Sequence, residues 1–284
     1  MKKYLIVGGV AGGATAAARL RRVDEDAQII LFEKGEHVSF ANCGLPYYVG
    51  GAITERDALL VQTPAGLRAR FNIDVRVQNE VIGLEAAGRK VRVRLPQGGI
   101  YEESYDALLL APGAKALRPP IPGLDQERIV SLRNVADADA LKQLADQFAG
   151  RGRAVVVGGG FIGVETAENL RERGLSVTLV EAAPHILAPF DTDMVKLAEM
   201  ELNAHGIGLH LGDGVAAFLP QTDGGLQVRL ASGAELAADF VVLAIGVQPD
   251  TDFLQDSGLA LGPRGHIMVD SYLRTNLPEV YAVG

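Results

Sequence analysis

Short apolar runs recur along the chain, and the first two frame an alanine-rich segment. Tyr4–Val7 is followed by a segment from about Gly12 to Arg22, and then by the run Gln28–Glu33. Apolar runs of this length without alternation are typical of buried parallel strands. The small residues between them predict a helix that packs close to a sheet. The pattern therefore predicts a strand, a helix and a second strand.

A glycine-rich turn joins the first predicted strand to the helix, and the second strand ends in an acid. The turn is Gly8-Gly9-Val10-Ala11-Gly12-Gly13, and the acid is Glu33. This order is typical of the dinucleotide-binding βαβ unit, in which the helix N-terminus holds the pyrophosphate and the acid binds a ribose hydroxyl. Val10 occupies the place of the second glycine, so a generic α/β turn is the alternative interpretation.

The same pattern occurs a second time. Ala154–Val157 predicts a strand, Gly158–Gly163 matches G-x-G-x-x-G, a helix runs from about Glu165, and Ser176–Glu181 is a strand that ends in an acid. The run Asp239–Gly246 also parallels an earlier one, Asp106–Gly113. A duplication is much more specific than a single motif, and it predicts two dinucleotide sites.

The remaining pattern predicts smaller elements. Strands of small antiparallel elements are expected at 74–81, 90–95, 227–230 and 235–237, and further helices at 137–148 and 191–205. Three prolines within 119–122 indicate a linker. We expect an α/β fold with two Rossmann-like domains, each with a small antiparallel β element.

Composition narrows the partners and the compartment. The net charge of -8, with no basic block, argues against nucleic acid. No apolar run approaches the roughly 18 residues that a membrane helix needs. A signal peptide at the N-terminus is a weaker interpretation of the first strand and its glycine turn. The histidines show no metal-ligand spacing, so no metal is expected. A single cysteine excludes internal disulfides and fits a reducing cytosol, so we expect a cytoplasmic protein.

That single cysteine, Cys43, lies in a segment suited to chemistry. A lone cysteine is by default a small buried apolar residue. Ser39 and Asn42, however, place hydrogen-bonding groups just before it, and Gly44 leaves room for another molecule to approach the sulfur. Pro46 is tolerated in the first turn of a helix, so a helix is predicted to start beside Cys43. Unpaired N–H groups at a helix start favour a thiolate, which is the reactive form.

Two dinucleotide sites and a reactive thiol together suggest a path for electrons. A nicotinamide gives hydride, a flavin receives two electrons, and a sulfur bond at Cys43 is reduced. Glu181 is followed by Ala182 and by no arginine, which favours NADH over NADPH. Arg19 and Arg22 share one helix face with Thr15, as a solvated basic stripe or as a clamp for an anionic substrate.

These residues resemble a known family, the flavin-dependent pyridine nucleotide–disulfide oxidoreductases. Within it the chain is most similar to the single-cysteine branch of coenzyme A-disulfide reductases and NADH-dependent persulfide or polysulfide reductases. The resemblance rests on the segment Ser39–Tyr47 around Cys43, on Gly8–Gly13 with its valine, on Ala111-Pro112-Gly113 and on Gly158–Glu165. It implies FAD in the first site, NAD(P)H in the second, and a mixed disulfide between Cys43 and coenzyme A. It also implies that the second domain is inserted in the first, so that a discontinuous FAD-binding domain covers 1–118 and 247–284 and the NAD(H)-binding domain covers 119–246.

The resemblance also carries site residues over by position. The substrate-binding positions that it implies, for coenzyme A as substrate or bound ligand, are Thr15, Arg19, Arg22, Ser39, Asn42 and Phe71. The cofactor-binding positions that we assign are Gly8, Val10, Ala11, Gly12, Gly13, Glu33, Lys34, Val81, Ala111, Pro112, Gly113, Gly158, Gly160, Phe161, Ile162, Gly163, Glu165, Glu181, Ala182 and Gly246.

The C-terminus departs from the family pattern. After the segment that matches Tyr281–Gly284, the family continues with a flavin-binding aspartate and a dimerisation domain. We therefore expect a truncated chain, and a homodimer for the full-length protein. Two other hypotheses remain: an NADH oxidase or peroxidase in which Cys43 cycles through a sulfenic acid, and an inactive nucleotide-binding fragment. The sequence leaves open whether the sulfur substrate is a disulfide, a persulfide or a polysulfide.

Overall fold

The computed structural model describes all residues, Met1–Gly284, and their contacts divide the chain into two compact units. Unit 1 contains 1–41, 60–115 and 248–284, and unit 2 contains 42–59 and 116–247. The predicted domain boundaries lie within a few residues of the divisions near 116 and 248. The segment 42–59 groups with unit 2, whereas the predicted boundaries kept it in the first domain.

Unit 1 is built on a five-stranded parallel sheet with the order β18-β7-β1-β2-β3. Its strands are β1 (Lys3–Val7), β2 (Gln28–Glu33), β3 (Asp74–Val77), β7 (Ala107–Leu110) and β18 (Val280–Ala282), and its helices are α1 (Gly12–Val23) and α3 (Pro64–Phe71), with a 3-10 turn at η3 (Asp252–Leu254).

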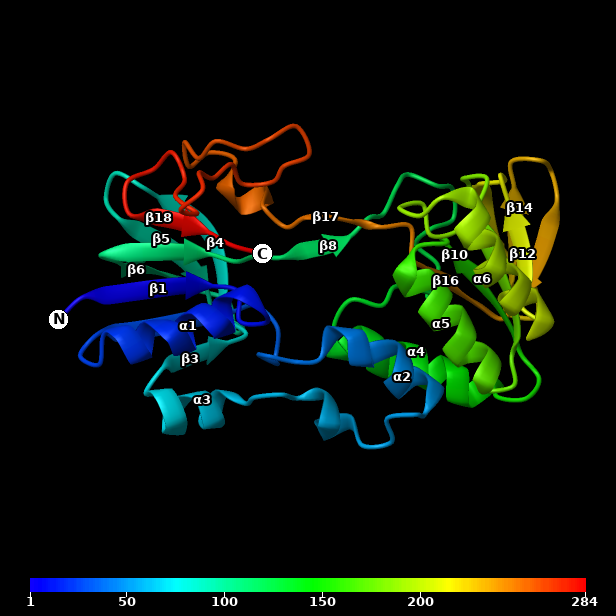
Figure 1. The fold of residues 1–284 in the computed structure, drawn as a ribbon, viewed down its shortest axis with the longest axis horizontal. Helices are drawn as coiled ribbons and strands as arrows, with labels where there is room; N and C mark the ends of the chain where they lie inside the picture. The colour runs from blue at the N-terminus through cyan, green and yellow to red at the C-terminus, as the bar shows by residue number, and fades with distance from the viewer. The chain divides into compact units, whose positions relative to one another are not determined.

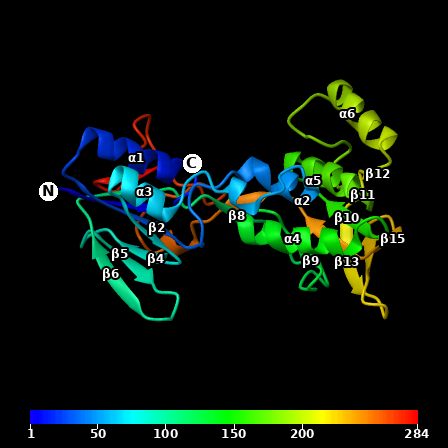
Figure 2. The same cartoon turned by 90° about the horizontal axis from the view of Figure 1, so that it is seen from below.

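The two faces of this sheet carry different layers. Figure 2 shows α1 and α3 on one side and an antiparallel sheet on the other, formed by β4 (Glu80–Glu85), β5 (Lys90–Arg94) and β6 (Ile100–Ser104). Successive side chains of a strand point to opposite faces of the sheet, so each face can bury apolar residues against its own layer. Leu5 points into a core with Val91 and Val93 of the antiparallel sheet, while Ile6 points into a core with Ala17 of α1.

The prediction of one continuous strand at 74–81 is wrong, because the structure has two strands there. Gln78 has a φ of +54°, which interrupts extended backbone, so the segment splits. β3 joins the parallel sheet beside β2, and only the part from Glu80 onward enters the antiparallel sheet. The partner strand β6 was not predicted, because Ile100–Ser104 carries several charged and polar residues.

Unit 2 is also built on a parallel sheet, which lies around β10 in Figure 1. Its parallel sheet has the order β12-β11-β10-β16-β9. The strands are β9 (Ile129–Val130), β10 (Arg153–Val157), β11 (Ser176–Glu181), β12 (Gly208–Leu211) and β16 (Phe240–Leu243), and an antiparallel sheet contains β13 (Val215–Pro220), β14 (Leu226–Leu230) and β15 (Glu235–Ala238). β13 was not predicted from the sequence.

The helices of unit 2 are α2 (Leu45–Gly50), α4 (Val135–Phe148), α5 (Phe161–Glu172) and α6 (Thr192–Ala204), and its 3-10 turns are η1 (Asn42–Gly44) and η2 (Arg56–Leu59). α4 begins two residues before its predicted start, because Asn134 and Asp137 form a reciprocal capping box. Strands β8 (Ala114–Ala116) and β17 (Val247–Pro249) pair with each other where the chain passes between the units.

The fold is therefore α/β with two Rossmann-like parallel sheets and two small antiparallel sheets, as predicted. None of the helices combines the length and the apolar character that a membrane crossing requires.

Candidate functional site

The first glycine turn allows the ends of β1 and β7 to approach closely. A Cβ atom on Gly8, whose φ is +96°, would lie 1.9 Å from the carbonyl oxygen of Ala111, and one on Gly13 would lie 1.8 Å from the Gly8 oxygen. Only glycine fits at both positions. Ala11 precedes α1 without a side-chain cap, so the first N–H groups of the helix are available to an anion.

The acid at the end of β2 organises this turn. The Glu33 carboxylate accepts hydrogen bonds from the N–H groups of Gly9 and Gly35, both at 2.8 Å. A cavity of about 60 Å³ lies beside it and is lined by five of the predicted cofactor residues, namely Gly8, Glu33, Lys34, Val81 and Pro112. Asn79, Asp250 and Phe253 also line this cavity, and no sequence motif marked them.

The remaining predicted residues of this region surround the same turn. Val10 and Ala11 lie between β1 and α1, and Gly12 and Gly13 open the helix. Ala111 and Gly113 flank Pro112 directly after β7.

The second glycine turn has the same construction. A Cβ atom on Gly158, whose φ is +111°, would lie 2.3 Å from the Ala244 oxygen, and one on Gly163 would lie 1.9 Å from the Gly158 oxygen. Gly160, in contrast, has nothing within 4 Å of where its Cβ would be. It precedes α5 without a side-chain cap. The open space at Gly160 and the uncapped N–H groups are the features that a pyrophosphate needs.

Side chains around the second turn are accessible. Phe161 is 55% exposed and Ile162 is 38% exposed, at the start of α5. Glu165 is half-buried one turn later. Gly246 has a φ of +118° and open space at its Cβ position.

Glu181 reproduces the arrangement of Glu33. Its carboxylate accepts the N–H of Gly159 at 2.6 Å and the N–H of Ala183 at 2.7 Å. Ala182 beside it is exposed, and the next two residues are Ala183 and Pro184, so no arginine follows the acid directly.

A cavity of about 420 Å³ between α1 and α3 gathers five of the six predicted substrate residues. Thr15, Arg19, Arg22, Ser39 and Phe71 all line it. Its lining also includes Arg70 and Gln62, but no carboxylate, and we call it the cationic cleft. Sequence analysis missed Arg70, although its position next to Phe71 was a usable signal. Arg19 and Arg22 of the predicted stripe therefore line the same cavity as Arg70, and their role as a substrate clamp stays a prediction.

Ser39 connects the cationic cleft to the first glycine turn. Its N–H donates to the Gly9 oxygen at 2.8 Å, and its own oxygen accepts the N–H of Val61 at 3.0 Å. The φ of Ser39 is +48°, an uncommon conformation for a residue other than glycine. The backbone bonds hold this residue in place beside the glycine turn.

Cys43 lies in unit 2, in the 3-10 turn η1 directly before α2, and it is exposed. Pro46 occupies the first turn of α2, as predicted. Asn42 is also exposed and belongs to unit 2, so it is the one predicted substrate residue that does not line the cationic cleft.

The short helix α2 is anchored within unit 2. Tyr48 is buried, and its hydroxyl donates to Asp139 of α4 at 3.2 Å. Burial and this hydrogen bond raise the pKa of Tyr48 above its usual value. Arg56 also pairs with Asp139, at 2.7 Å. The turn that carries Cys43 is therefore attached to a fixed helix.

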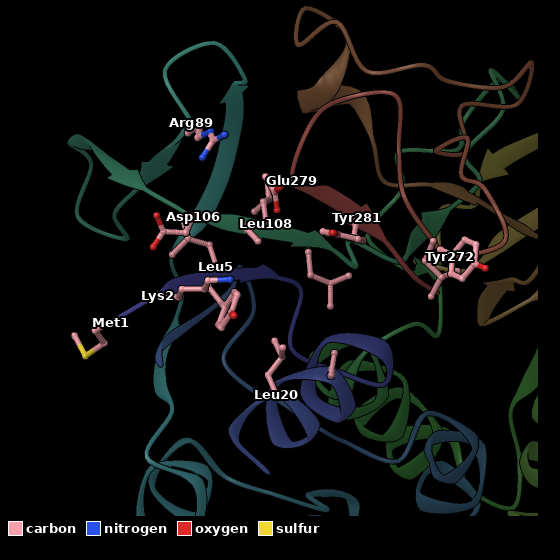
Figure 3. A pocket seen from close by; sticks show the side chains of 15 residues that line it. Met1, Lys2, Leu5, Leu20, Arg89, Asp106, Leu108, Tyr272, Glu279 and Tyr281 are labelled. Atoms are coloured by element: carbon pink, nitrogen blue, oxygen red, sulfur yellow. The ribbon is translucent and has the colours of Figure 1, made fainter. Parts of the chain in front are cut away.

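A larger cavity, of about 750 Å³, lies elsewhere in unit 1 (Figure 3). It lies against β1, β7 and β18 beside α1, and Leu20, Leu108 and Tyr281 are among its lining residues. None of the predicted site residues lines it.

The chain is similar to known proteins over its whole length. Residues 2–284 match the family described as pyridine nucleotide-disulphide oxidoreductase. The coenzyme A disulfide reductase of Staphylococcus haemolyticus is 37% identical over the whole chain. The chain spans 63% of the length of that relative.

Two solved structures are also similar. The reduced Bacillus anthracis protein CoADR-RHD shares 46% identity, with a TM-score of 0.95, over 100% of this chain and 50% of its own. An NAD-dependent persulfide reductase from A. fulgidus shares 35% identity, with a TM-score of 0.94, over 99% of this chain and 53% of its own. This chain therefore belongs to the pyridine nucleotide-disulphide oxidoreductase family.

Proposed function

We propose that the protein is an NADH-dependent reductase of coenzyme A disulfide or coenzyme A persulfide that acts through Cys43. The observation that carries this proposal is the cationic cleft. Three arginines, a threonine and a serine line it, two of the arginines lie over one phenylalanine ring, and the lining contains no carboxylate. Guanidinium groups match phosphates well, and coenzyme A is a thiol that carries several phosphates.

The cofactors of the proposal are FAD in unit 1 and NADH in unit 2. The first glycine turn, Glu33 and the small cavity beside Lys34 fit the nucleotide end of FAD. The open space at Gly160 and the Glu181 carboxylate fit NADH. FAD, when bound, would supply a carrier that takes two electrons from a nicotinamide and passes them to sulfur.

The thiol chemistry of the proposal needs one protein cysteine. The Cys43 thiolate attacks one sulfur of coenzyme A disulfide, forms a mixed disulfide and releases one coenzyme A thiolate, which takes up a proton. Two electrons from NADH and a further proton then restore Cys43 and release the second coenzyme A thiol. The exposure of Cys43 permits the attack, and Thr15, Arg19, Arg22 and Ser39 would hold the nucleotide end of the substrate.

The proposal also covers the compartment and the oligomeric state of the enzyme. We propose a cytoplasmic homodimer for the full-length protein. The reducing cytosol keeps a single exposed thiol reduced. Sedimentation of the full-length protein tests the oligomeric state: a dimer mass is expected, and a monomer mass at micromolar concentration would contradict it.

An NADH titration of the purified protein tests the function. A flavin absorbance spectrum is expected, followed by NADH consumption that depends on added coenzyme A disulfide or coenzyme A persulfide. The faster of the two substrates identifies the physiological class. Peroxide consumption without turnover of either sulfur substrate would replace the proposal with the peroxidase hypothesis. NADH binding without flavin absorbance or turnover would indicate a nucleotide-binding module.

A further inference from the structure

The cationic cleft contains one arginine that comes from outside the first glycine unit. Arg70 lies near the end of α3, whereas Arg19 and Arg22 lie on α1. We propose that Arg70 is a specificity-determining residue that binds a phosphate group of coenzyme A and selects phosphate-bearing thiols over thiols without phosphates. This inference rests on the proposed function for the identity of the ligand.

The first argument is charge. None of Arg19, Arg22 and Arg70 forms an ion pair with a carboxylate, although the protein as a whole carries a net charge of -8. Arg68, two residues before Arg70 on the same helix, is paired with Asp74 at 3.0 Å. Three uncompensated guanidinium groups at one cavity repel each other, and a ligand with several negative charges would remove that repulsion.

The second argument is the arrangement of these groups around an aromatic ring. The guanidinium of Arg70 lies 5.2 Å from the centroid of the Phe71 ring, and that of Arg22 lies 5.7 Å from the same centroid. Cation–π contacts favour these positions. Because the two cations come from different helices, the cleft offers phosphate donors on both of its walls.

The third argument is rigidity. Arg21, which lies on α1 between the cleft residues Arg19 and Arg22, donates from Nε to the Phe71 oxygen at 2.8 Å and from Nη2 to the Asn72 oxygen at 3.0 Å. It also bonds the carbonyls of Asp24, Glu25 and Ala27, so all five of its donors are used. The end of α3 that carries Arg70 is thereby fixed against α1. A preformed site loses less entropy when the ligand binds.

The test compares Arg70→Gln with a matched control, Arg68→Gln. Calorimetry measures the dissociation constant of coenzyme A for the wild type and both variants at low salt. A charge-assisted bond to phosphate is lost in Arg70→Gln, so we expect its dissociation constant to rise by about tenfold. Arg68→Gln should bind as the wild type does. The difference between wild type and Arg70→Gln should shrink as salt is added, because salt screens exposed charges.

Pantethine, the disulfide of the phosphate-free thiol arm of coenzyme A, separates specificity from folding. Turnover of pantethine should be the same for Arg70→Gln and the wild type. Equal coenzyme A affinity in both, or equal losses for coenzyme A and pantethine, would overturn the role of Arg70. The probe adenosine 3′,5′-bisphosphate separates the two proposals: Arg70-dependent binding of this probe without turnover of coenzyme A disulfide would overturn the proposed function and keep the anion site. Wild-type protein that binds neither coenzyme A nor the bisphosphate would overturn the inference itself.

Discussion

The carboxylate of Glu181 accepts the backbone N–H of Gly159 at 2.6 Å, which ties the end of β11 to the second glycine turn. Glu33 and Gly9 make the same contact in unit 1, at 2.8 Å. Each carboxylate is thus oriented before any cofactor binds. A carboxylate has about four acceptor positions, so acceptors remain for the hydroxyl groups of a ribose.

Cofactor preference follows from this orientation. Glu181→Gln removes the negative charge that favours a 2′-hydroxyl over a 2′-phosphate. We expect the ratio of kcat/KM for NADH to that for NADPH to fall by about tenfold, the size of a charged hydrogen bond. Steady-state kinetics with both nucleotides measure it, and Glu235→Gln, an exposed acid of β15, is the control. An unchanged ratio would show that Glu181 does not determine the preference for NADH over NADPH.

The open position at Gly160 permits a test of where the pyrophosphate lies. Gly160→Ala should fold with wild-type stability, because nothing lies within 4 Å of the new methyl group. The methyl group would occupy space that a dinucleotide backbone needs, so the KM for NADH should rise by about tenfold or more. Stopped-flow measurements of NADH binding check this. Undisturbed NADH binding would place the dinucleotide elsewhere.

Gly158→Ala is the contrasting variant. Its methyl group would lie 2.3 Å from the Ala244 oxygen at a φ of +111°, so the backbone itself must shift. We expect a loss of stability of about 2 kcal/mol or more, within the range for strained backbone positions. Thermal unfolding of both variants distinguishes them, and equal melting temperatures would contradict the geometry of the turn.

The Glu103 carboxylate predicts a pH dependence of stability. Burial opposes its ionisation, but hydrogen bonds from Lys3 and Arg76 outweigh burial and lower its pKa below the usual 4.5. A lowered pKa in the folded state stabilises the protein above pH 4.5, and this contribution disappears as the pH falls through the folded-state pKa. Glu103→Gln should cost about 1–2 kcal/mol at pH 7.

Urea unfolding of the wild type and Glu103→Gln across pH 3–7 checks the sign. The difference in free energy of unfolding should narrow below pH 4.5. A difference that stays constant or grows with acid would show that the ion pairs of Glu103 do not stabilise the fold.

The sequence predicted the parts of the fold that depend on local chemistry. The two glycine turns, the acids that end β2 and β11, and the start of α2 before Pro46 are all where the pattern places them. Each of these features needs a backbone conformation that only a few residue types adopt. Of the five predicted substrate residues that line the cationic cleft, Thr15, Arg19 and Arg22 follow from helix periodicity, whereas Ser39 and Phe71 come from other segments.

What the sequence could not predict depends on packing between distant segments. The break at Gln78 is a single positive φ, which no glycine or proline announces. The grouping of 42–59 with unit 2 depends on contacts such as the one between Tyr48 and Asp139, ninety-one positions apart. The role of Arg21 needs five carbonyls that only the folded chain brings together.

The variant Cys43→Ser, assayed for NADH-driven reduction of coenzyme A disulfide, tests most directly whether the reaction passes through this thiol. The change replaces the only thiol of the chain with a hydroxyl of similar size. We predict that coenzyme A release falls to background, while the flavin spectrum and NADH oxidation by an artificial electron acceptor stay at wild-type levels. Undiminished reduction of coenzyme A disulfide by Cys43→Ser would show that the reaction does not pass through Cys43.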